Sequence, residues 1–347
     1  MMRRKPVVTA IGTALLITAG AVVYAAGPYK LHLPLGLQEQ AENIPANNPL
    51  TPEKIALGKL LFFDKRISAD GTVACATCHN PDFGFTDSKP VSDGIRGQQG
   101  KRSAPSAINR LFSSNQFWDG RAKSLEDQAK KPMTNPIEMG HTLEGVVKRL
   151  RAIRGYRVLF KQAFGTEKFT IDDVAKAIAC YERTILSGDS PYDRYEAGDK
   201  SALSPAAQRG LALFNGKANC VRCHTGFNFT DESYNNLGVG WDPAKKEFTD
   251  DGRFAISNKI HQDGAFKTPT LRNIAQTAPY MHDGSEKTLE ETVEFYDKGG
   301  NPNPNLSKEI KPLHLTVQDK ADLVAFMKSL TGEIPKDVVT PPISFPK

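Results

Sequence analysis

Two copies of the pattern Cys-x-x-Cys-His constrain this chain more than any other feature of its sequence. The two copies contain Cys75, Cys78, His79, Cys220, Cys223 and His224. Two thiols at this spacing can both bond covalently to the edge of one porphyrin, and the histidine that follows can bind its iron. A zinc site would need a second pair of ligands near each motif. The sequence therefore predicts two covalently bound haem c groups.

The fifth cysteine, Cys180, is isolated from both motifs. Val174, Ala177, Ile178 and Tyr181 surround it at helical spacing and form an apolar stripe. We therefore expect Cys180 to be a reduced, partly buried residue of a helix rather than a partner in a disulfide.

Residues 1–26 have the composition of an export signal. Arg3, Arg4 and Lys5 precede an apolar run at 7–23, and two alanines follow it. A membrane-spanning helix needs about 20 apolar residues, so we expect cleavage, with an uncleaved anchor in the inner membrane as the alternative. Covalent haem attachment takes place outside the bacterial cytoplasm, so motif and signal together predict a periplasmic protein.

The formal charge of the whole chain is +6, and residues 1–26 contribute three positive charges and no negative ones, which leaves +3. So small an excess argues against nucleic acid as a partner. It is compatible with docking of an acidic electron-donor protein, but an ordinary solvated surface is the favoured interpretation.

The order of sequence signals predicts a mainly α fold with two cytochrome c-like domains, long loops and one covalently bound haem c in each domain. Thr51-Pro52 and Ser204-Pro205 each begin a helical pattern shortly before a haem motif, which indicates a weak internal repeat. The predicted divisions are 1–26 as signal peptide or anchor, 27–197 as the N-terminal domain, 198–334 as the C-terminal domain and 335–347 as an extended tail.

Further helices are predicted at 143–164 and at 316–330, where apolar residues recur at helical spacing. A capping-box pattern marks the start of the second. The segments 228–252 and 299–306 are rich in Gly, Asn, Asp and Pro and are predicted to be loops. Strand signals are scarce throughout.

Four further segments carry a family resemblance over about residues 50–332. They are QFWDGRA at 116–122, NPIEM at 135–139, KTPTLRN at 267–273 and PYMHDG at 279–284. With two haem motifs in this order, the chain resembles the bacterial di-haem cytochrome c peroxidases, which include the MauG branch. The resemblance implies that the N-terminal haem reacts with peroxide and that the C-terminal haem accepts and relays electrons.

The resemblance also implies roles for individual residues. Glu138 matches the family's distal acid/base glutamate, which moves a proton between the two oxygens of peroxide. Gln128 matches a distal amide that holds the peroxide, and Pro132 lines the same pocket. Trp118 matches a tryptophan that bridges the two haems, although a core aromatic residue is the simpler structural reading.

The axial ligands separate the branches of this family. Many members carry a removable histidine on the peroxide haem, and Ile95 stands at that position here. Isoleucine cannot bind iron, so we expect a five-coordinate haem with His79 as its only protein ligand. His141 is the alternative sixth ligand.

At the C-terminal haem, the resemblance places Tyr296 where plain peroxidases have methionine. Tyrosine is the ligand in the MauG branch, and an anionic phenolate stabilises ferric iron. Met281 and Met327 are the alternative ligands. The family also binds one calcium ion, for which Ser103, Thr277 and Pro279 are the matching donors.

The leading functional hypothesis is a periplasmic peroxidase that reduces hydrogen peroxide with electrons from a small cytochrome c or cupredoxin. A MauG-type enzyme, which uses peroxide to oxidise side chains of a partner protein, is the second. Ala218 and Asn219 stand where that branch has a surface tryptophan, and Trp118 and Trp241 are the only tryptophans. The third hypothesis is a non-enzymatic two-haem electron carrier or redox sensor.

Overall fold

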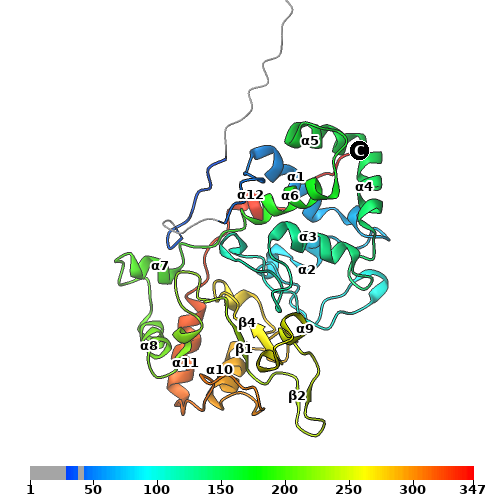
Figure 1. Ribbon diagram of the computed structural model, residues 1–347. Coiled ribbons are helices and arrows are strands. Elements are labelled where there is room, and N and C mark those ends of the chain that lie inside the picture. Colours follow the sequence, from blue (N-terminus) through cyan, green and yellow to red (C-terminus); the bar gives the residue numbers. More distant parts are fainter. Residues whose placement is uncertain (1–28, 38–42) are drawn as a thin grey trace, which may run out of the picture.

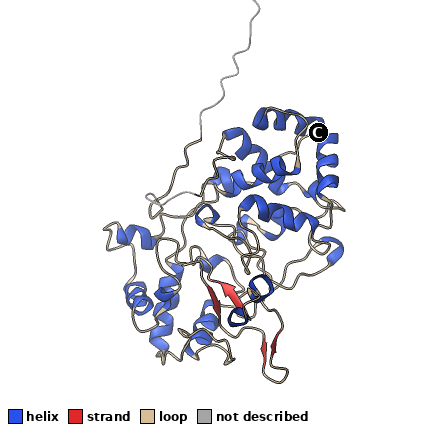
Figure 2. Cartoon of the chain, in the orientation of Figure 1, coloured by secondary structure: helices blue, strands red, loops and turns tan. Residues whose placement is uncertain are grey.

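The computed structural model describes residues 29–37 and 43–347. The predicted signal segment at 1–26 therefore lies outside the described residues. Within the described part of the chain, no helix is long and apolar enough to cross a membrane. Helices and long loops make up almost all of the structure, and the few strands are short (Figure 2).

The described residues of the N-terminal half form seven α-helices. They are α1 (Pro52–Phe63), α2 (Cys75–Cys78), α3 (Leu125–Thr134), α4 (Leu143–Ala152), α5 (Arg154–Phe164), α6 (Ile171–Glu182) and α7 (Pro191–Glu196). Short 3₁₀ turns link them at η1 (Lys65–Ile67), η2 (Pro81–Phe83), η3 (Ile95–Gly97) and η4 (Arg110–Phe112).

The C-terminal half combines helices with two small antiparallel strand pairs. Its α-helices are α8 (Pro205–Asn215), α9 (Phe254–Ser257), α10 (Leu289–Asp297), α11 (Val317–Lys328) and, in the tail, α12 (Lys336–Val339). Its 3₁₀ turns are η5 (Cys220–Arg222), η6 (Ile260–Gln262) and η7 (Ile274–Gln276). The strands are β1 (Tyr234–Asn236), β2 (Trp241–Asp242), β3 (Glu247–Phe248) and β4 (Ala265–Lys267), with β1 paired to β4 and β2 to β3.

The internal repeat is visible in the packing of α1 and α8. Each of the two helices has a Thr or Ser cap and a proline at its first position. A Cβ atom at Gly58 of α1 would collide with the backbone of α6, and one at Gly210 of α8 would collide with the backbone of α11. The two glycines therefore let each haem-side helix approach a second helix closely.

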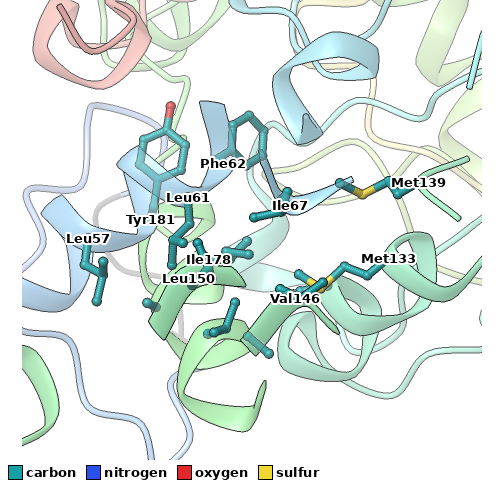
Figure 3. Close-up of a cluster of buried hydrophobic side chains, with 14 of the residues drawn as sticks. Leu57, Leu61, Phe62, Ile67, Met133, Met139, Val146, Leu150, Ile178 and Tyr181 are labelled. Carbon is teal, nitrogen blue, oxygen red and sulfur yellow. The ribbon is translucent and has the colours of Figure 1, made fainter. Parts of the chain in front are cut away.

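Two main hydrophobic clusters follow from these helix pairs. In the first, Leu57, Leu61 and Phe62 of α1 pack against Ile178 and Tyr181 of α6 (Figure 3). The second cluster joins α8, α10 and α11 around their aromatic and aliphatic side chains, including Phe214, Phe229, Val293, Leu323 and Phe326. Each cluster lies beside one of the two haem motifs.

The helix predicted over 143–164 is wrong in one respect, because it is broken at Ile153 into α4 and α5. Leu150 and Tyr156 are both fully buried. Six residues of a continuous helix turn through about 600°, which would point these two side chains to different faces. The extended backbone of Ile153 rotates α5 about its axis relative to α4, so that both helices bury their apolar side against one cluster.

One of the two loop predictions and the prediction for the tail also change in part. The segment 228–252 contains the short strands β1, β2 and β3, whereas 299–306 contains no helix or strand, as expected.

The tail is not simply extended, because it contains α12 and then runs back to the N-terminal half (Figure 1). There the Tyr181 hydroxyl donates to Val338 O at 2.9 Å, and Gly155 N donates to Lys347 O at 2.8 Å. The domain division between 197 and 198 stays a prediction.

A buried ion pair fixes the segment that enters the C-terminal half. Both terminal nitrogens of Arg272 donate to the Asp193 carboxylate at 2.8 Å, and the Arg272 Nε donates to Phe227 O. The two charged side chains are only 1% and 2% exposed. Burial alone would raise the pKa of Asp193, but the hydrogen bonds and charge of Arg272, together with the hydrogen bonds from Ser190, outweigh it, and the pKa lies below its usual value.

Candidate active site

One cavity of about 880 Å³ lies between the two halves and reaches both haem motifs. It also brings together every predicted site residue: Cys75, Cys78, His79, Ser103, Trp118, Gln128, Glu138, Cys220, Cys223, His224, Thr277, Pro279 and Tyr296. The wall is mostly apolar, as a site for a porphyrin must be. The structure thus places residues that are more than 200 positions apart around one space.

The two motif histidines have the same local geometry. His79 Nδ1 lies 3.1 Å from Phe85 O, and His224 Nδ1 lies 3.0 Å from Phe229 O. A carbonyl oxygen can only accept a hydrogen bond, so Nδ1 carries the proton and Nε2 of each ring is the nitrogen left free to bind iron. Burial lowers the pKa of both histidines, which keeps the rings in the neutral form that a metal requires.

The four motif thiols are also compatible with haem attachment. All four are unpaired and partly buried at the cavity wall. Burial raises the pKa of Cys78 and of Cys220 to about 12, so neither is a thiolate suited to a free metal ion. Together with the neutral histidines and the apolar wall, the residues present fit two haem c groups.

Replacing both Cys75 and Cys78 with serine should leave one covalently bound haem per chain instead of two, because only the second motif can then form thioether bonds. The measurement is haem content after denaturation and removal of free haem. Cys180→Ser is the matched control. Cys180 is buried beside Asn48, away from the cavity, so this variant should keep both haems. Loss of a haem in the control would contradict the assignment.

The candidate peroxide side of the cavity is formed by α3 and the turn that follows it. Gln128 and Pro132 of α3 and Glu138 of the turn all line the wall. Asn135 Nδ2 donates to Glu138 Oε1 at 2.8 Å and thereby fixes the carboxyl group. Burial raises the pKa of Glu138, although Arg121 and Asn135 oppose the shift. A carboxyl group with a raised pKa is suited to take up and release a proton near neutral pH.

Ile95 and His141 both lie outside this cavity. Ile95 is 2% exposed and its side chain packs against Gly140, while its N–H donates to Glu138 O at 3.0 Å. His141 Nδ1 accepts a hydrogen bond from Thr142 N, and the ring contacts Gly145 of α4. Neither residue is among those that line the wall. The structure therefore gives no support to His141 as an alternative ligand.

Trp118 is held at the junction of the two halves. Its indole N–H donates to Ser103 O at 2.9 Å, and its backbone carbonyl accepts from Lys267 N of β4 at 2.7 Å. The turn that follows is fixed by Asp119, which accepts hydrogen bonds from Arg102 and Arg121. Trp118 thus faces the shared cavity from a rigid position between the motifs.

The candidate ligands of the second haem lie on different elements around the second motif. Tyr296 of α10 lines the cavity, and its hydroxyl makes no hydrogen bond to any part of the protein that the structure describes. Burial raises the pKa of this phenol, with the nearby thiols of Cys220 and Cys223 adding to the effect. Met327 also lines the wall but packs in the second hydrophobic cluster.

The three predicted calcium donors lie on the same cavity wall. Ser103 is buried, and its hydroxyl already donates to Met281 O at 3.0 Å. The Thr277 hydroxyl donates to Ile274 O, so its backbone carbonyl is the group that would face an ion. The calcium site stays a prediction.

Sequence reasoning missed several charged residues of the cavity wall. Arg110, Glu182 and Lys267 line it, as do Arg102 and Asp250, which pair with each other. Lys267 stands first in the KTPTLRN segment and could have been found there. Arg110 and Glu182 carry no local signal, because only the tertiary fold brings them to the cavity.

Comparison with known proteins gives the family. Residues 52–201 match the family described as di-haem cytochrome c peroxidase, and residues 207–331 match cytochrome c. Over 292 residues the chain is 44% identical to the methylamine utilization protein MauG of Methylorubrum extorquens, with 83% of this chain and 81% of that protein covered. The chain belongs to the di-haem cytochrome c peroxidase family. It is therefore an oxidoreductase with two haem c groups.

A further relative and a solved structure support the same family and the same fold. Cytochrome c551 peroxidase of Nitrosomonas europaea is 37% identical over 321 residues, which cover 92% of this chain and 91% of that protein. A crystal structure of a MauG-like protein associated with microbial copper homeostasis has a TM-score of 0.81 and 35% identity, and covers 87% of this chain and 97% of that one. The predicted helical fold and the two predicted haem groups are thus confirmed.

Proposed function

We propose that this family member is a periplasmic peroxidase. It reduces one hydrogen peroxide to two waters with two protons and two electrons, and a small cytochrome c or a cupredoxin supplies the electrons. The observation that carries this proposal is the half-buried Glu138 carboxyl group, which lines the same cavity as the first motif and is held by Asn135.

When bound, the two haem c groups supply iron that binds peroxide and exchanges single electrons. His79 and His224 are the residues that would hold the two irons, and Tyr296 would be a further ligand of the second. Ile95 packs into the core in place of a ligand, so the protein offers the first iron His79 alone.

Proton transfer falls to Glu138 in this proposal. Cleavage of the O–O bond requires that a proton move from the near oxygen of peroxide to the far one. Ionised Glu138 accepts the first proton and returns it to the departing oxygen, which leaves as water. The Gln128 amide, which makes no hydrogen bond to a described protein group, positions the peroxide from the same wall.

Electron transfer between the halves falls to Trp118. An indole can be oxidised and can act as an intermediate site, which an aliphatic residue cannot. The Trp118 indole N–H donates to Ser103 O, and the Trp118 carbonyl accepts from Lys267 N on the other side of the junction, so the position of Trp118 relative to each motif is fixed.

The rate of reaction with peroxide should fall as the pH is lowered through the pKa of Glu138. Burial raises this pKa above its usual 4.5, and the residue must be ionised to accept a proton. The acid limb of kcat/KM should therefore lie above pH 4.5. A rate that stays constant down to this pH would remove Glu138 from the proposed role.

Steady-state turnover tests the function. The loaded protein, a reduced small cytochrome c and hydrogen peroxide should give oxidation of two cytochromes for each peroxide consumed. No turnover with reduced cytochromes and cupredoxins of either net charge, despite full haem content, would contradict the proposal.

A MauG-type reaction on a partner protein is the second candidate. Tyr296 beside the second motif and the 44% identity to MauG favour it. In that case peroxide would oxidise side chains of another protein, such as tryptophans that become a quinone cofactor, and a peroxide-dependent change in the mass of that protein would be the readout. Ala218 and Asn219 stand where the MauG branch has a surface tryptophan, which counts against this candidate.

A further inference from the structure

Arg110 is an enclosed arginine without a carboxylate partner. Its Nε donates to Gln116 Oε1 at 2.7 Å and one terminal nitrogen donates to Asn115 O at 2.8 Å. The other terminal nitrogen has no acceptor in the described part of the protein, and the side chain lines the haem cavity. One edge of this guanidinium group is therefore free to bind something inside the cavity.

Three other enclosed arginines of this protein are paired with carboxylates at 2.6–2.8 Å. They are Arg102 with Asp119 and Asp250, Arg183 with Glu126, and Arg272 with Asp193. An enclosed charge normally needs such a partner, because removal from water costs several kcal/mol. Among the described carboxylates, none lies within 4 Å of Arg110. Arg149 also lacks a carboxylate partner, but both of its terminal nitrogens donate to backbone carbonyls and it does not line the cavity. Arg110 differs because it keeps a terminal nitrogen without an acceptor and lines the cavity.

Lys267 is the second cation at this place. It is 5% exposed, lines the cavity and donates to Glu232 Oε1 at 3.0 Å. The other oxygen of Glu232 already accepts two hydrogen bonds from Ser114. Burial, followed by the charge of Arg110, lowers the pKa of Lys267 to about 7. The single negative charge of Glu232 is therefore not enough to neutralise both Lys267 and Arg110.

Glu182 does not supply the missing negative charge. Its carboxyl group lines the cavity, has one buried oxygen without a protein partner, and makes no side-chain hydrogen bond among the described residues. Burial raises the pKa of Glu182 to about 8, which leaves it mostly neutral at pH 7. Arg110, Lys267, Glu232 and Glu182 thus form a buried group with an excess of positive charge.

This group also spans the junction of the two halves. Arg110 belongs to η4, and its charge acts on His79 of the first motif. Lys267 belongs to β4, and its backbone N–H donates to the Trp118 carbonyl. An anion bound here would lie within the shared cavity and beside the tryptophan that separates the motifs.

We propose that Arg110 and Lys267 bind haem propionate carboxylates at this junction, with Arg110 on the N-terminal haem. A guanidinium group with one free edge suits a carboxylate oxygen. The two cations also favour the reduced state of the haem, because the added electron is attracted to nearby positive charge. This inference rests on the haem content and not on the proposed reaction.

Redox titration of the loaded protein, without peroxide, tests the proposal. Arg110→Met and Lys267→Met should each lower the ferrous-to-ferric ratio of at least one haem about tenfold at a fixed potential. A tenfold change corresponds to about 59 mV for one electron. Arg110→Lys keeps the charge and should stay within about threefold of the unmodified protein. Resonance Raman spectra of Arg110→Met should show a shifted propionate-bending band.

Two cations outside the cavity, half-buried Arg149 and buried Lys54, supply matched controls. Arg149 donates only to backbone carbonyls, and Lys54 donates to Asn48 Oδ1 and Pro49 O. Arg149→Met and Lys54→Met should leave both potentials unchanged. The proposal is overturned if the cavity variants, with both haems bound, shift the potentials no more than these controls. An unchanged propionate band in Arg110→Met would overturn it as well, and Lys267→Met tests it separately should Arg110→Met not fold.

Discussion

Glu138→Gln should lower kcat/KM for hydrogen peroxide by about 10²- to 10⁴-fold, the usual contribution of a general acid–base group. Glutamine has nearly the same shape and can keep a hydrogen bond with Asn135, but it cannot accept the peroxide proton. The measurement is the rate of peroxide consumption at saturating electron donor. Both haems should remain bound, because Glu138 belongs to neither motif.

Glu144→Gln is the matched control for this change. Glu144 is an exposed carboxylate in the first turn of α4 and does not line the cavity. Its replacement should leave kcat/KM within about twofold of the unmodified protein. Equal rates for Glu138→Gln and Glu144→Gln would show that another group moves the proton.

Asp193→Asn should reduce the free energy of unfolding by about 3–5 kcal/mol, because it leaves the Arg272 charge buried without its partner. The pair also carries a pH dependence. The pKa of Asp193 is below its usual value in the folded protein, so its contribution is present above the unfolded pKa and is lost as the pH falls through the folded one. Denaturant unfolding near neutral pH and in acid measures both effects.

The exposed pair of Asp189 and Arg194 provides the comparison. Its side chains are 52% and 49% exposed, so Asp189→Asn should cost at most about 1 kcal/mol. The gap between the two variants should also narrow in acid, where Asp193 is protonated. An equal loss of stability in both variants would mean that burial of the Arg272 pair carries no special weight.

Local signals in the sequence were sufficient for the parts of the fold that depend on local interactions. The Thr51 and Ser204 caps, the two haem motifs and the mainly helical character all follow from residues a few positions apart. The break at Ile153 could not be predicted in this way. Its cause is the burial of Leu150 and Tyr156 against the same cluster, which depends on α1 and α6.

The residues of the candidate site could also be predicted only in part. Glu138, Trp118 and Tyr296 were found because they lie in segments that resemble a family, and the fold brings them to one cavity. Arg110 and Glu182 lie in segments without such a resemblance. Their importance appears only when the positive and negative side chains around the cavity are counted together, and this requires the tertiary structure.

Cyanide titration of the oxidised protein, followed by electron paramagnetic resonance, tests the central claim most directly. The account predicts one high-spin and one low-spin ferric signal, with a single equivalent of cyanide abolishing the high-spin signal alone. Two low-spin signals that ignore cyanide would instead describe an electron carrier with no open coordination position. Binding of two equivalents would contradict the role given to Tyr296.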